Sequence, residues 1–221
     1  MKLEGIVFKS ITYKEKSKIV YLYTKIGKIS VKAIGSKNSK KNTFGFGEVG
    51  NIVSFVSTDA EFPSLIEYEI INSAYKYTNS FDSIMALGKI IELINYLPDD
   101  SLHDKLYPFV KKIIMNLDKE PLKALSIFLI KMTYNFGISP KLDSCISCND
   151  TNIKFFSVSK GGAVCKNCSK NYNDDLSIWN EYYKDKKDIN EYSICDYKEL
   201  LKRINKYYLI HAHLNLKIMW G

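Results

Sequence analysis

The sequence has almost no arginine. Arg203 is its one arginine, against 31 lysines in 221 residues. The commonest base-specific contact in DNA recognition is an arginine fork on guanine, and lysine replaces that fork only partly. If this protein binds nucleic acid, we therefore expect contacts to phosphates rather than readout of a base sequence.

Long apolar runs and catalytic motifs are also missing. The longest apolar run, 124–130, has seven residues, too few for a membrane helix, and no signal peptide is visible. The sequence has no phosphate-cradling G-x-x-x-x-G-K-[ST] loop, and "GFGEVG" at 45–50 precedes a strand rather than a helix, unlike a nucleotide fingerprint. Three histidines and scattered acids form no convincing nucleophile–base pair. We expect a cytoplasmic protein that touches no membrane and is not an enzyme.

Lysine is concentrated at the start of the chain. Residues 1–41 hold eleven lysines and two glutamates, a local charge of +9, whereas the remaining 180 residues hold 21 basic and 22 acidic groups, or −1. Such a segment is typical of a surface that binds a polyanion, and nucleic acid is the first candidate. The alternative is a solvated surface that reflects the lysine bias of the composition. The candidate DNA-binding residues are Lys9, Lys14, Lys16, Lys18, Lys32, Lys37, Lys40 and Lys41.

Alternating apolar residues predict five short strands in the first 75 residues, at 3–10, 18–24, 28–35, 51–56 and 64–71. This count suggests a small antiparallel barrel, of which the OB-fold is the commonest nucleic-acid-binding form. Two lysine-rich loops, 12–18 and 35–47, also contain Tyr13, Phe44 and Phe46. These rings could stack on bases while lysines contact phosphates. For any single ring, a place in the core is the simpler interpretation.

Helical periodicity takes over near residue 80, with helices predicted at 80–97, 103–117, 120–137 and 196–219. The predicted fold class is therefore α+β. An OB-fold domain, residues 1–79, precedes a mainly helical domain, residues 80–221, which contains an inserted cysteine module at about 141–172.

Four of the five cysteines form two C-x-x-C pairs separated by sixteen residues. The pairs are Cys145 with Cys148 and Cys165 with Cys168. This spacing predicts a four-thiolate zinc site, and a site with four protein ligands has no open position for substrate, so the Zn²⁺ would be structural. A redox pair, an iron–sulfur cluster and four unrelated thiols are the alternatives. Cys195 stands alone, and we expect it to be a small buried residue.

Two stretches resemble the RecO family of bacterial DNA repair and recombination mediators. One is "EGIVFKSITYKEKSKIVYLYTKIGKISVKAIGSKNSKK" at 4–41, and the other is "NFGISPKLDSCISCNDTNIKFFSVSKGGAVCKNC" at 135–168. The tail at 200–217 is similar to that family's closing helix. The order of these segments matches zinc-containing members, while the scarcity of arginine departs from the family pattern.

The resemblance implies an OB-fold domain followed by a helical domain with a zinc module. It implies binding of single- and double-stranded DNA and annealing of complementary strands, in the cytoplasm at the nucleoid. It also implies cooperation with RecR in loading RecA, and contact with the C-terminal tail of single-strand-binding protein (SSB). The residues alone leave two alternatives open: a zinc-ribbon factor of the transcription or RNA-binding type, and an accessory subunit of a nucleic-acid enzyme.

Overall fold

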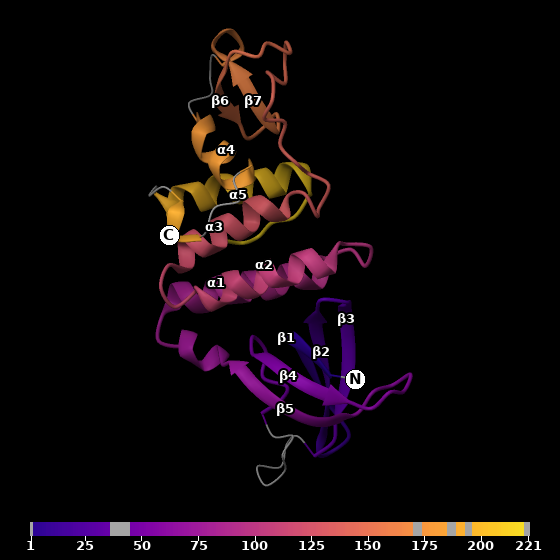
Figure 1. Cartoon of the computed structure of the whole chain (residues 1–221). Helices are drawn as coiled ribbons and strands as arrows, with labels where there is room; N and C mark the ends of the chain where they lie inside the picture. Colours follow the sequence, from indigo (N-terminus) through magenta and orange to yellow (C-terminus); the bar gives the residue numbers. More distant parts are fainter. Residues whose placement is uncertain (1, 36–44, 170–173, 185–188, 193–195, 219–221) are drawn as a thin grey trace. The chain divides into compact units, whose positions relative to one another are not determined.

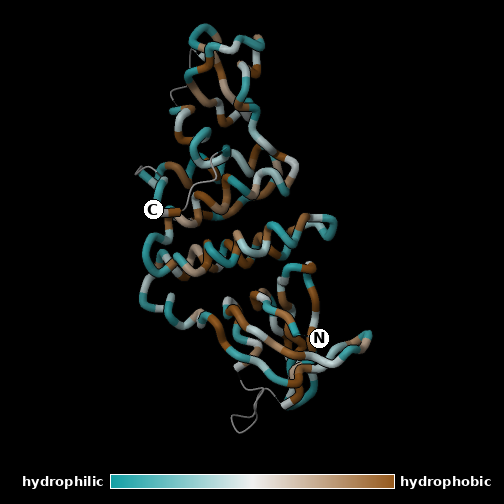
Figure 2. The backbone as a smooth tube through the Cα atoms, in the orientation of Figure 1, coloured by the Kyte–Doolittle hydropathy of each residue, from teal (hydrophilic) through white to brown (hydrophobic). Residues whose placement is uncertain are grey.

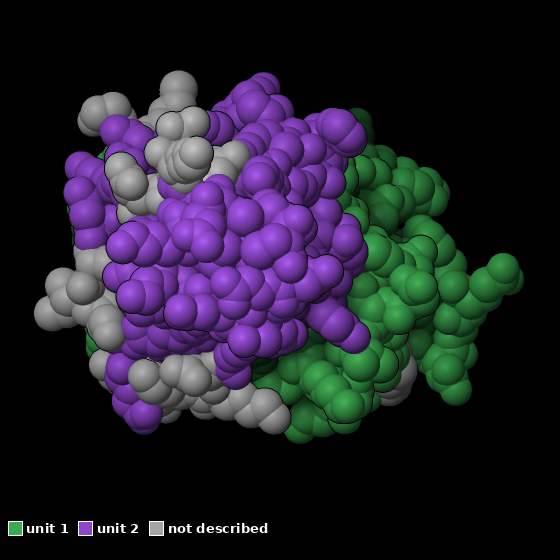
Figure 3. All heavy atoms as spheres, turned by 90° about the horizontal axis from the view of Figure 1, so that it is seen from above, with its two compact units in different colours: residues 1–121 green, residues 122–221 purple. Residues whose placement is uncertain are grey.

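A computed structural model describes residues 2–35, 45–169, 174–184, 189–192 and 196–218. The chain divides into two compact units, residues 1–121 and 122–221, drawn in green and purple in Figure 3. Strands give way to helices near residue 79, as predicted, yet the first two helices belong to the same compact unit as the strands. Among the described helices, none combines the length and apolarity that a membrane crossing needs.

Unit 1 begins with a five-stranded antiparallel barrel (Figure 1). The strands hydrogen-bond in the order β3-β2-β1-β4-β5. A parallel bridge between Lys32 and Ser64, with a 2.8 Å hydrogen bond from the Lys32 N–H to the Pro63 carbonyl, connects β3 to β5 and closes the barrel. This connectivity confirms the predicted OB-fold. The strands are β1 (Lys2–Tyr13), β2 (Ser17–Thr24), β3 (Gly27–Ala33), β4 (Ile52–Ser57) and β5 (Leu65–Asn72).

The barrel interior is filled by every second residue of its strands, because successive side chains point to opposite faces. Figure 2 shows brown, apolar segments interspersed with teal and white ones along the barrel strands. A bulge between Val7 and Lys9 interrupts the pairing of β1 with β2. Bulges bend a strand and increase its twist, which suits the long strand β1 because it pairs with β2 along one part and with β4 along another. Phe46 is fully buried in this core, so its ring serves the core.

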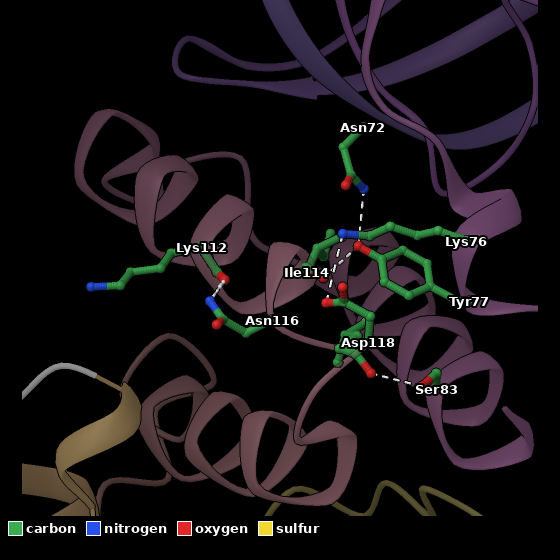
Figure 4. Close-up of polar contacts among 9 residues, drawn as sticks. Asn72, Lys76, Tyr77, Ser83, Lys112, Ile114, Asn116 and Asp118 are labelled. Carbon is green, nitrogen blue, oxygen red and sulfur yellow. Dashed lines mark hydrogen bonds and ion pairs between the residues drawn. The ribbon is translucent and has the colours of Figure 1, made fainter.

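Two helices complete unit 1, namely α1 (Phe81–Tyr96) and α2 (His103–Met115). Ser80 caps α1 by accepting a hydrogen bond from the Ser83 N–H. The Ser83 hydroxyl in turn donates to the Leu117 carbonyl at 2.7 Å. Figure 4 shows this bond beside the ion pair of Lys76 and Asp118, whose charged atoms are 3.7 Å apart. The Ser83 side chain near the start of α1 therefore binds the backbone just after α2.

Unit 2 is mainly helical. Its helices are α3 (Pro121–Met132), α4 (Leu176–Lys184) and α5 (Tyr197–His211). Pro121 is the first residue of α3, a position that suits proline because the N–H missing there would have no partner within the helix. The Tyr208 hydroxyl of α5 donates to the Leu129 carbonyl of α3 at 2.7 Å, and the Tyr207 hydroxyl donates to the Ile138 carbonyl at 2.6 Å. These two tyrosines hold α5 against α3 and the segment after it.

The closing helix is shorter than the predicted helix at 196–219. It ends at His211, since His213 adopts a positive φ of 54° that a continuing helix does not allow. The chain then folds back: the Leu214 N–H donates to the Tyr208 carbonyl, and the Leu216 N–H donates to the Asn205 side-chain oxygen. The apolar residues after His213 had suggested a continued helix, and this part of the prediction is wrong.

The cysteine module contains a small sheet of β6 (Ile153–Ser157), β7 (Gly162–Cys165) and β8 (Asp174–Asp175). The β6–β7 hairpin brings the second cysteine pair back toward the first. Phe156 of this hairpin stacks on Trp179 of α4, with ring centroids 3.9 Å apart and planes 11° from parallel. The hairpin is thus packed against a helix that the sequence pattern did not predict.

Candidate nucleic-acid interface and metal centre

Strand pairing places several predicted lysines on the outer face of β1, β2 and β3. Lys9 of β1 pairs with Tyr21 of β2. Two residues earlier in β2, Ile19 pairs with Ile11 of β1 on one side and with Lys32 of β3 on the other. Because side chains two apart on a strand point to the same face, Lys9, Tyr21 and Lys32 lie on one side of the sheet. Lys9 is exposed, whereas Tyr21 and Lys32 are partly covered.

Aromatic rings lie beside these lysines. The Lys9 Nζ is 5.3 Å from the centroid of the Tyr21 ring. The Lys32 Nζ lies between two rings, 4.9 Å from the centroid of Phe62 and 5.8 Å from that of Tyr13. The Lys14 Nζ is 5.5 Å from the Tyr13 centroid. We call this set the lysine–aromatic face; it consists of Lys9, Lys14, Lys32, Tyr13, Tyr21 and Phe62.

The lysine–aromatic face lies where OB-folds bind oligonucleotides, that is, on strands 2 and 3 and on the loops after strands 1 and 4. Lys14 lies in the loop after β1, and Phe62 in the loop after β4. Barrel closure at Lys32 and Ser64 brings the second loop beside β3. Lysines in such a place can contact phosphates, and the rings offer flat surfaces for base stacking.

The far end of the same outer face is covered by α2. Tyr23 and Lys28 pair across β2 and β3, and the Tyr23 ring meets the His103 ring edge-on with centroids 5.6 Å apart. Burial raises the pKa of the Tyr23 hydroxyl well above its usual value. Lys28 donates to the Leu97 carbonyl at 2.8 Å and pairs with Asp99 at 3.2 Å. These contacts belong to the packing of unit 1, so the accessible part of the face is the end that contains Lys9 and Lys32.

The other predicted lysines are not members of this set. Lys18 alternates with Ile19 and so points to the opposite side of β2, where it pairs with Glu48 at 3.2 Å. Lys16 is exposed in the turn that joins β1 to β2. The remaining three, Lys37, Lys40 and Lys41, lie outside the described residues, as does Phe44.

Tyr21 and Phe62 were not singled out from the sequence. In the sequence, Tyr21 is one member of an alternating strand pattern. Its accessibility depends on which half of the outer face α2 covers. Phe62 stands in an acidic loop, thirty positions after Lys32, and only barrel closure brings the two together. An aromatic residue in the loop after the fourth strand of an OB-fold is a usable signal, but only once that fold has been recognised.

The four cysteines of the two pairs converge. Their sulfur atoms all lie within 4.8 Å of one another, and the Sγ atoms of Cys148 and Cys165 are 3.6 Å apart. The backbone forms a tight turn around the first pair: the Asn149 N–H donates to the Cys145 carbonyl, and the Cys145 N–H donates to the Asp150 carbonyl, both at 2.8 Å. The four thiols could therefore hold a metal ion.

The sulfur spacing suits a tetrahedral metal. A Zn–S bond of about 2.3 Å implies sulfur–sulfur distances of about 3.8 Å around a zinc ion. The Cys148–Cys165 distance is close to that value. Cys145 and Cys165 are buried, Cys168 is partly exposed and Cys148 is exposed, so the centre lies at the edge of the module. Cys195, the fifth cysteine, lies outside the described residues.

The thiols differ in acidity. Burial opposes ionisation of Cys145, but backbone N–H groups of Cys165, Ser147 and Cys148 donate to its sulfur and bring its pKa down to about 6. Hydrogen bonds that Cys168 shares with the Cys148 and Cys165 sulfurs raise its pKa to about 12. The Cys145 sulfur thus favours the thiolate, which is the form that binds metals, whereas the Cys168 sulfur keeps its proton.

Comparisons with known proteins identify the family of both parts of the chain. The family model described as "Recombination protein O N terminal" matches residues 1–74, and the model described as "Recombination protein O C terminal" matches residues 79–182. The helix α5 lies beyond both matches.

Individual relatives point to the same family. The chain is 30% identical over 176 residues to the DNA repair protein RecO of Halalkalibacterium halodurans, covering 76% of this chain and 68% of the relative. It is 32% identical over 177 residues to the RecO protein of a Thermoanaerobacter species, covering 76% and 71%. It is 27% identical over 188 residues to the RecO protein of Caldicellulosiruptor saccharolyticus, covering 80% and 76%. The chain therefore belongs to the RecO family of DNA repair and recombination proteins.

Proposed function

We propose that this protein binds single- and double-stranded DNA without sequence specificity and anneals complementary strands. With RecR, it helps load RecA on single strands coated with SSB. The observation that supports this proposal most directly is the lysine–aromatic face on the OB barrel of a RecO family member.

The lysine–aromatic face suits a DNA strand because its two kinds of side chain act on different parts of a nucleotide. Lys9, Lys14 and Lys32 contact phosphates, and Tyr13, Tyr21 and Phe62 stack on bases. Neither contact reads base identity, since every nucleotide has a phosphate and every base has a flat face. The scarcity of arginine fits this mode of binding.

Annealing follows from the charge of the binding surface. Two DNA strands repel each other through their phosphates, and bound lysine ammonium groups reduce that repulsion because they neutralise phosphate charge. The release of condensed counterions favours this binding. A protein that holds one strand with its bases accessible raises the chance that a complementary strand pairs. This activity needs no bond to be made or broken, so we propose that the protein is not an enzyme. RecR and the SSB tail are the partners that the family suggests, and the cytoplasmic nucleoid is the place of action.

Zinc is the metal that we propose for Cys145, Cys148, Cys165 and Cys168. The ion would supply a cross-link between the first cysteine turn and the end of β7. A module of this size buries few large side chains, and structural zinc contributes on the order of 10–16 kcal/mol in comparable small folds. With four cysteine ligands, the ion would have no position left for a substrate.

The decisive experiment measures annealing of complementary strands precoated with SSB. We expect the wild-type protein to accelerate annealing. The triple variant K9Q/K14Q/K32Q should lose the acceleration and should show a weaker salt dependence of DNA affinity, by a log–log slope of about 2.1 if each lysine meets one phosphate of a single strand. The matched control K2Q/K25Q/K76Q removes the same charge from other parts of unit 1 and should retain most of the activity.

Other results would point to other functions. No acceleration by the wild-type protein would contradict the annealing proposal. A strong preference for one duplex sequence would favour a transcription factor, and tighter binding of RNA than of DNA with the same sequence would favour an RNA-binding protein. Nuclease or ATPase activity in the purified protein would favour a subunit of an enzyme.

A further inference from the structure

Cys148 is the exposed member of the cysteine centre. Cys145 and Cys165 are buried, and Cys168 is partly covered. A zinc ion with four cysteine ligands has no position for a substrate, but a small oxidant reacts with a ligand sulfur rather than with the ion. An exposed ligand sulfur therefore gives this centre a chemistry that closed coordination does not exclude.

Positive charge is held on both sides of Cys148. The Lys160 Nζ donates to the Ser147 hydroxyl oxygen at 2.7 Å, and the Lys141 Nζ donates to the Asn149 side-chain oxygen at 2.8 Å. Ammonium groups near a reacting sulfur stabilise the negative charge that develops on the oxygen leaving a peroxide. A sulfur bound to zinc is already a thiolate, whatever its acidity in the metal-free protein. Cys148 thus combines exposure with an electropositive surrounding, the two properties of selectively oxidised cysteines.

A second sulfur lies within reach of Cys148, and it belongs to the other cysteine pair. The Sγ atoms of Cys148 and Cys165 are 3.6 Å apart. A disulfide bond is about 2.05 Å long, so these sulfurs need to approach each other by about 1.5 Å. The Cys145 sulfur is instead held by donation from three backbone N–H groups, those of Ser147, Cys148 and Cys165. A bond between the two pairs is therefore favoured over a bond within the first pair.

We propose that Cys148 is a site of oxidation by hydrogen peroxide, and that Cys165 completes a disulfide with it. The Cys148 thiolate attacks one peroxide oxygen; an S–O bond forms, the O–O bond breaks and hydroxide leaves. The Cys165 thiolate then attacks the Cys148 sulfur; the S–S bond forms, the S–O bond breaks and a second hydroxide leaves. The two sulfurs lose two electrons, the peroxide gains them, and both hydroxides take protons from the solvent.

The disulfide would replace the metal as a cross-link. It leaves Cys145 and Cys168 as two thiolates, too few for a four-coordinate structural zinc, so the oxidised centre should lose its ion. The new bond joins the first cysteine turn to the end of β7, the same two segments that the ion would connect. The oxidised module therefore keeps a covalent link, and reduction in the presence of Zn²⁺ should restore the original centre. The inference rests on the proposed function for the identity of the metal.

The test maps the disulfide in the full-length, zinc-loaded protein after treatment with an equimolar amount of hydrogen peroxide. Free thiols are alkylated under denaturing conditions, and the protein is digested with trypsin without reduction. Cleavage after lysines 141, 154, 160, 166 and 170 places Cys145 and Cys148 on peptide 142–154, Cys165 on 161–166 and Cys168 on 167–170.

Peptides 142–154 and 161–166 should appear linked, and fragmentation should assign the bond to Cys148 and Cys165. Cys145 and Cys168 should be alkylated. A chromogenic chelator should detect about one zinc ion lost per disulfide formed, and dithiothreitol with Zn²⁺ should reverse both changes.

The charge at Lys160 gives a second measurement. K160Q should slow disulfide formation about two- to five-fold at low ionic strength, the range expected for one exposed charge. The control K154Q removes the same charge from the same module. Lys154 lies between Ile153 and Phe155, which both pack on the cysteine cluster, so its side chain points to the other face of β6. K154Q should react as fast as the wild type, and equal rates in K160Q and K154Q would overturn the role given to Lys160.

The outcomes separate this inference from the proposed function. A disulfide within one pair, a link from peptide 167–170 to another peptide, or retention of all zinc after treatment would overturn the oxidation site while leaving structural zinc in place. Another metal in the untreated protein would contradict the proposed zinc, and the same peptide map would still decide between a Cys148–Cys165 bond and any other pairing.

Discussion

The hydroxyl of Tyr77 donates a hydrogen bond of 2.7 Å to the carbonyl oxygen of Ile114 (Figure 4). The same hydroxyl accepts a bond of 2.9 Å from the side-chain amide of Asn72, at the end of β5. Tyr77 is 1% exposed, and burial raises its pKa to about 12, so the donor proton is retained at physiological pH. One side chain thus links the last barrel strand to the end of α2 within unit 1.

Replacing Tyr77 with phenylalanine should destabilise unit 1 by about 1–3 kcal/mol. The change leaves the Asn72 amide buried without its bond to the hydroxyl, and an unsatisfied buried group costs about that much. The Ile114 carbonyl loses one bond but keeps the bond of 3.1 Å from the Leu117 N–H. Urea denaturation followed by circular dichroism measures the loss. The control Y75F removes a hydroxyl from a ring that is 79% exposed and should leave stability unchanged. Equal stability of Y77F and Y75F would contradict this account of Tyr77.

Replacing Phe62 with alanine should weaken single-stranded DNA binding without changing its salt dependence. Base stacking on an aromatic ring is worth about 1–3 kcal/mol, which corresponds to a roughly 5- to 150-fold rise in the dissociation constant. No charge is lost, so the log–log salt slope should stay constant. K32Q should instead lower the slope by about 0.7. The two variants therefore distinguish stacking from phosphate contact at neighbouring positions of the lysine–aromatic face.

The control for Phe62 is Ile26, an apolar residue of the β2–β3 turn that is 57% exposed. I26A should bind DNA as the wild type does. If F62A also binds like the wild type, Phe62 is no stacking platform. If F62A lowers the salt slope as K32Q does, the ring acts by positioning Lys32, whose Nζ lies 4.9 Å from its centroid.

Local patterns predicted most of the elements. The five strands of the barrel depend on the alternation of apolar and polar residues, which is visible within a few residues. Helix α4 was missed because its nine residues are short and flanked by polar chain, and its burial comes from Trp179 stacking on Phe156 of a different element. The end of α5 was misplaced because apolar residues continue after the backbone turns back.

The candidate site was only partly predictable, for a related reason. Composition indicated the lysines, but it could not separate Lys32, beside two rings, from Lys18, which faces the other way and pairs with Glu48. That separation depends on strand register. The contribution of Phe62 depends on barrel closure. Each is a long-range relationship that no short window of sequence contains.

Removing the metal should unfold the cysteine module while the barrel stays folded. The buried cluster around the centre is small, consisting of Cys145, Val164 and Cys165 with a few partly buried neighbours, so it cannot replace the stabilisation of a bound ion. Hydrogen exchange after treatment with a strong chelator should show new exchange in residues 141–168 and protection retained in β1–β5. C148S should reproduce the effect, and S147A should not. Unchanged exchange in the module would contradict a structural role for the metal.

Binding of Zn²⁺ at pH 7.5 should release protons, including those of Cys148 and Cys168. Hydrogen bonds with neighbouring sulfurs raise the pKa of Cys168 to about 12. Donation from the Asp150 backbone lowers the pKa of Cys148, but hydrogen bonds with the Cys145 and Cys165 sulfurs outweigh it, so this pKa is raised as well. Both thiols therefore hold protons in the metal-free protein at this pH, and metal binding must displace them. Cys145, with a pKa of about 6, is already a thiolate and contributes little.

Calorimetric titration in buffers of different ionisation enthalpy measures the number of protons released. We expect at least two per metal bound at pH 7.5. Between pH 7.5 and pH 5 the number should rise as Cys145 takes up a proton in the metal-free protein, and the apparent affinity should fall. C168S should reduce the release at pH 7.5 by about one proton, whereas C145S should reduce it by much less than one. Similar reductions in the two variants would show that the thiols do not differ in acidity before the metal binds.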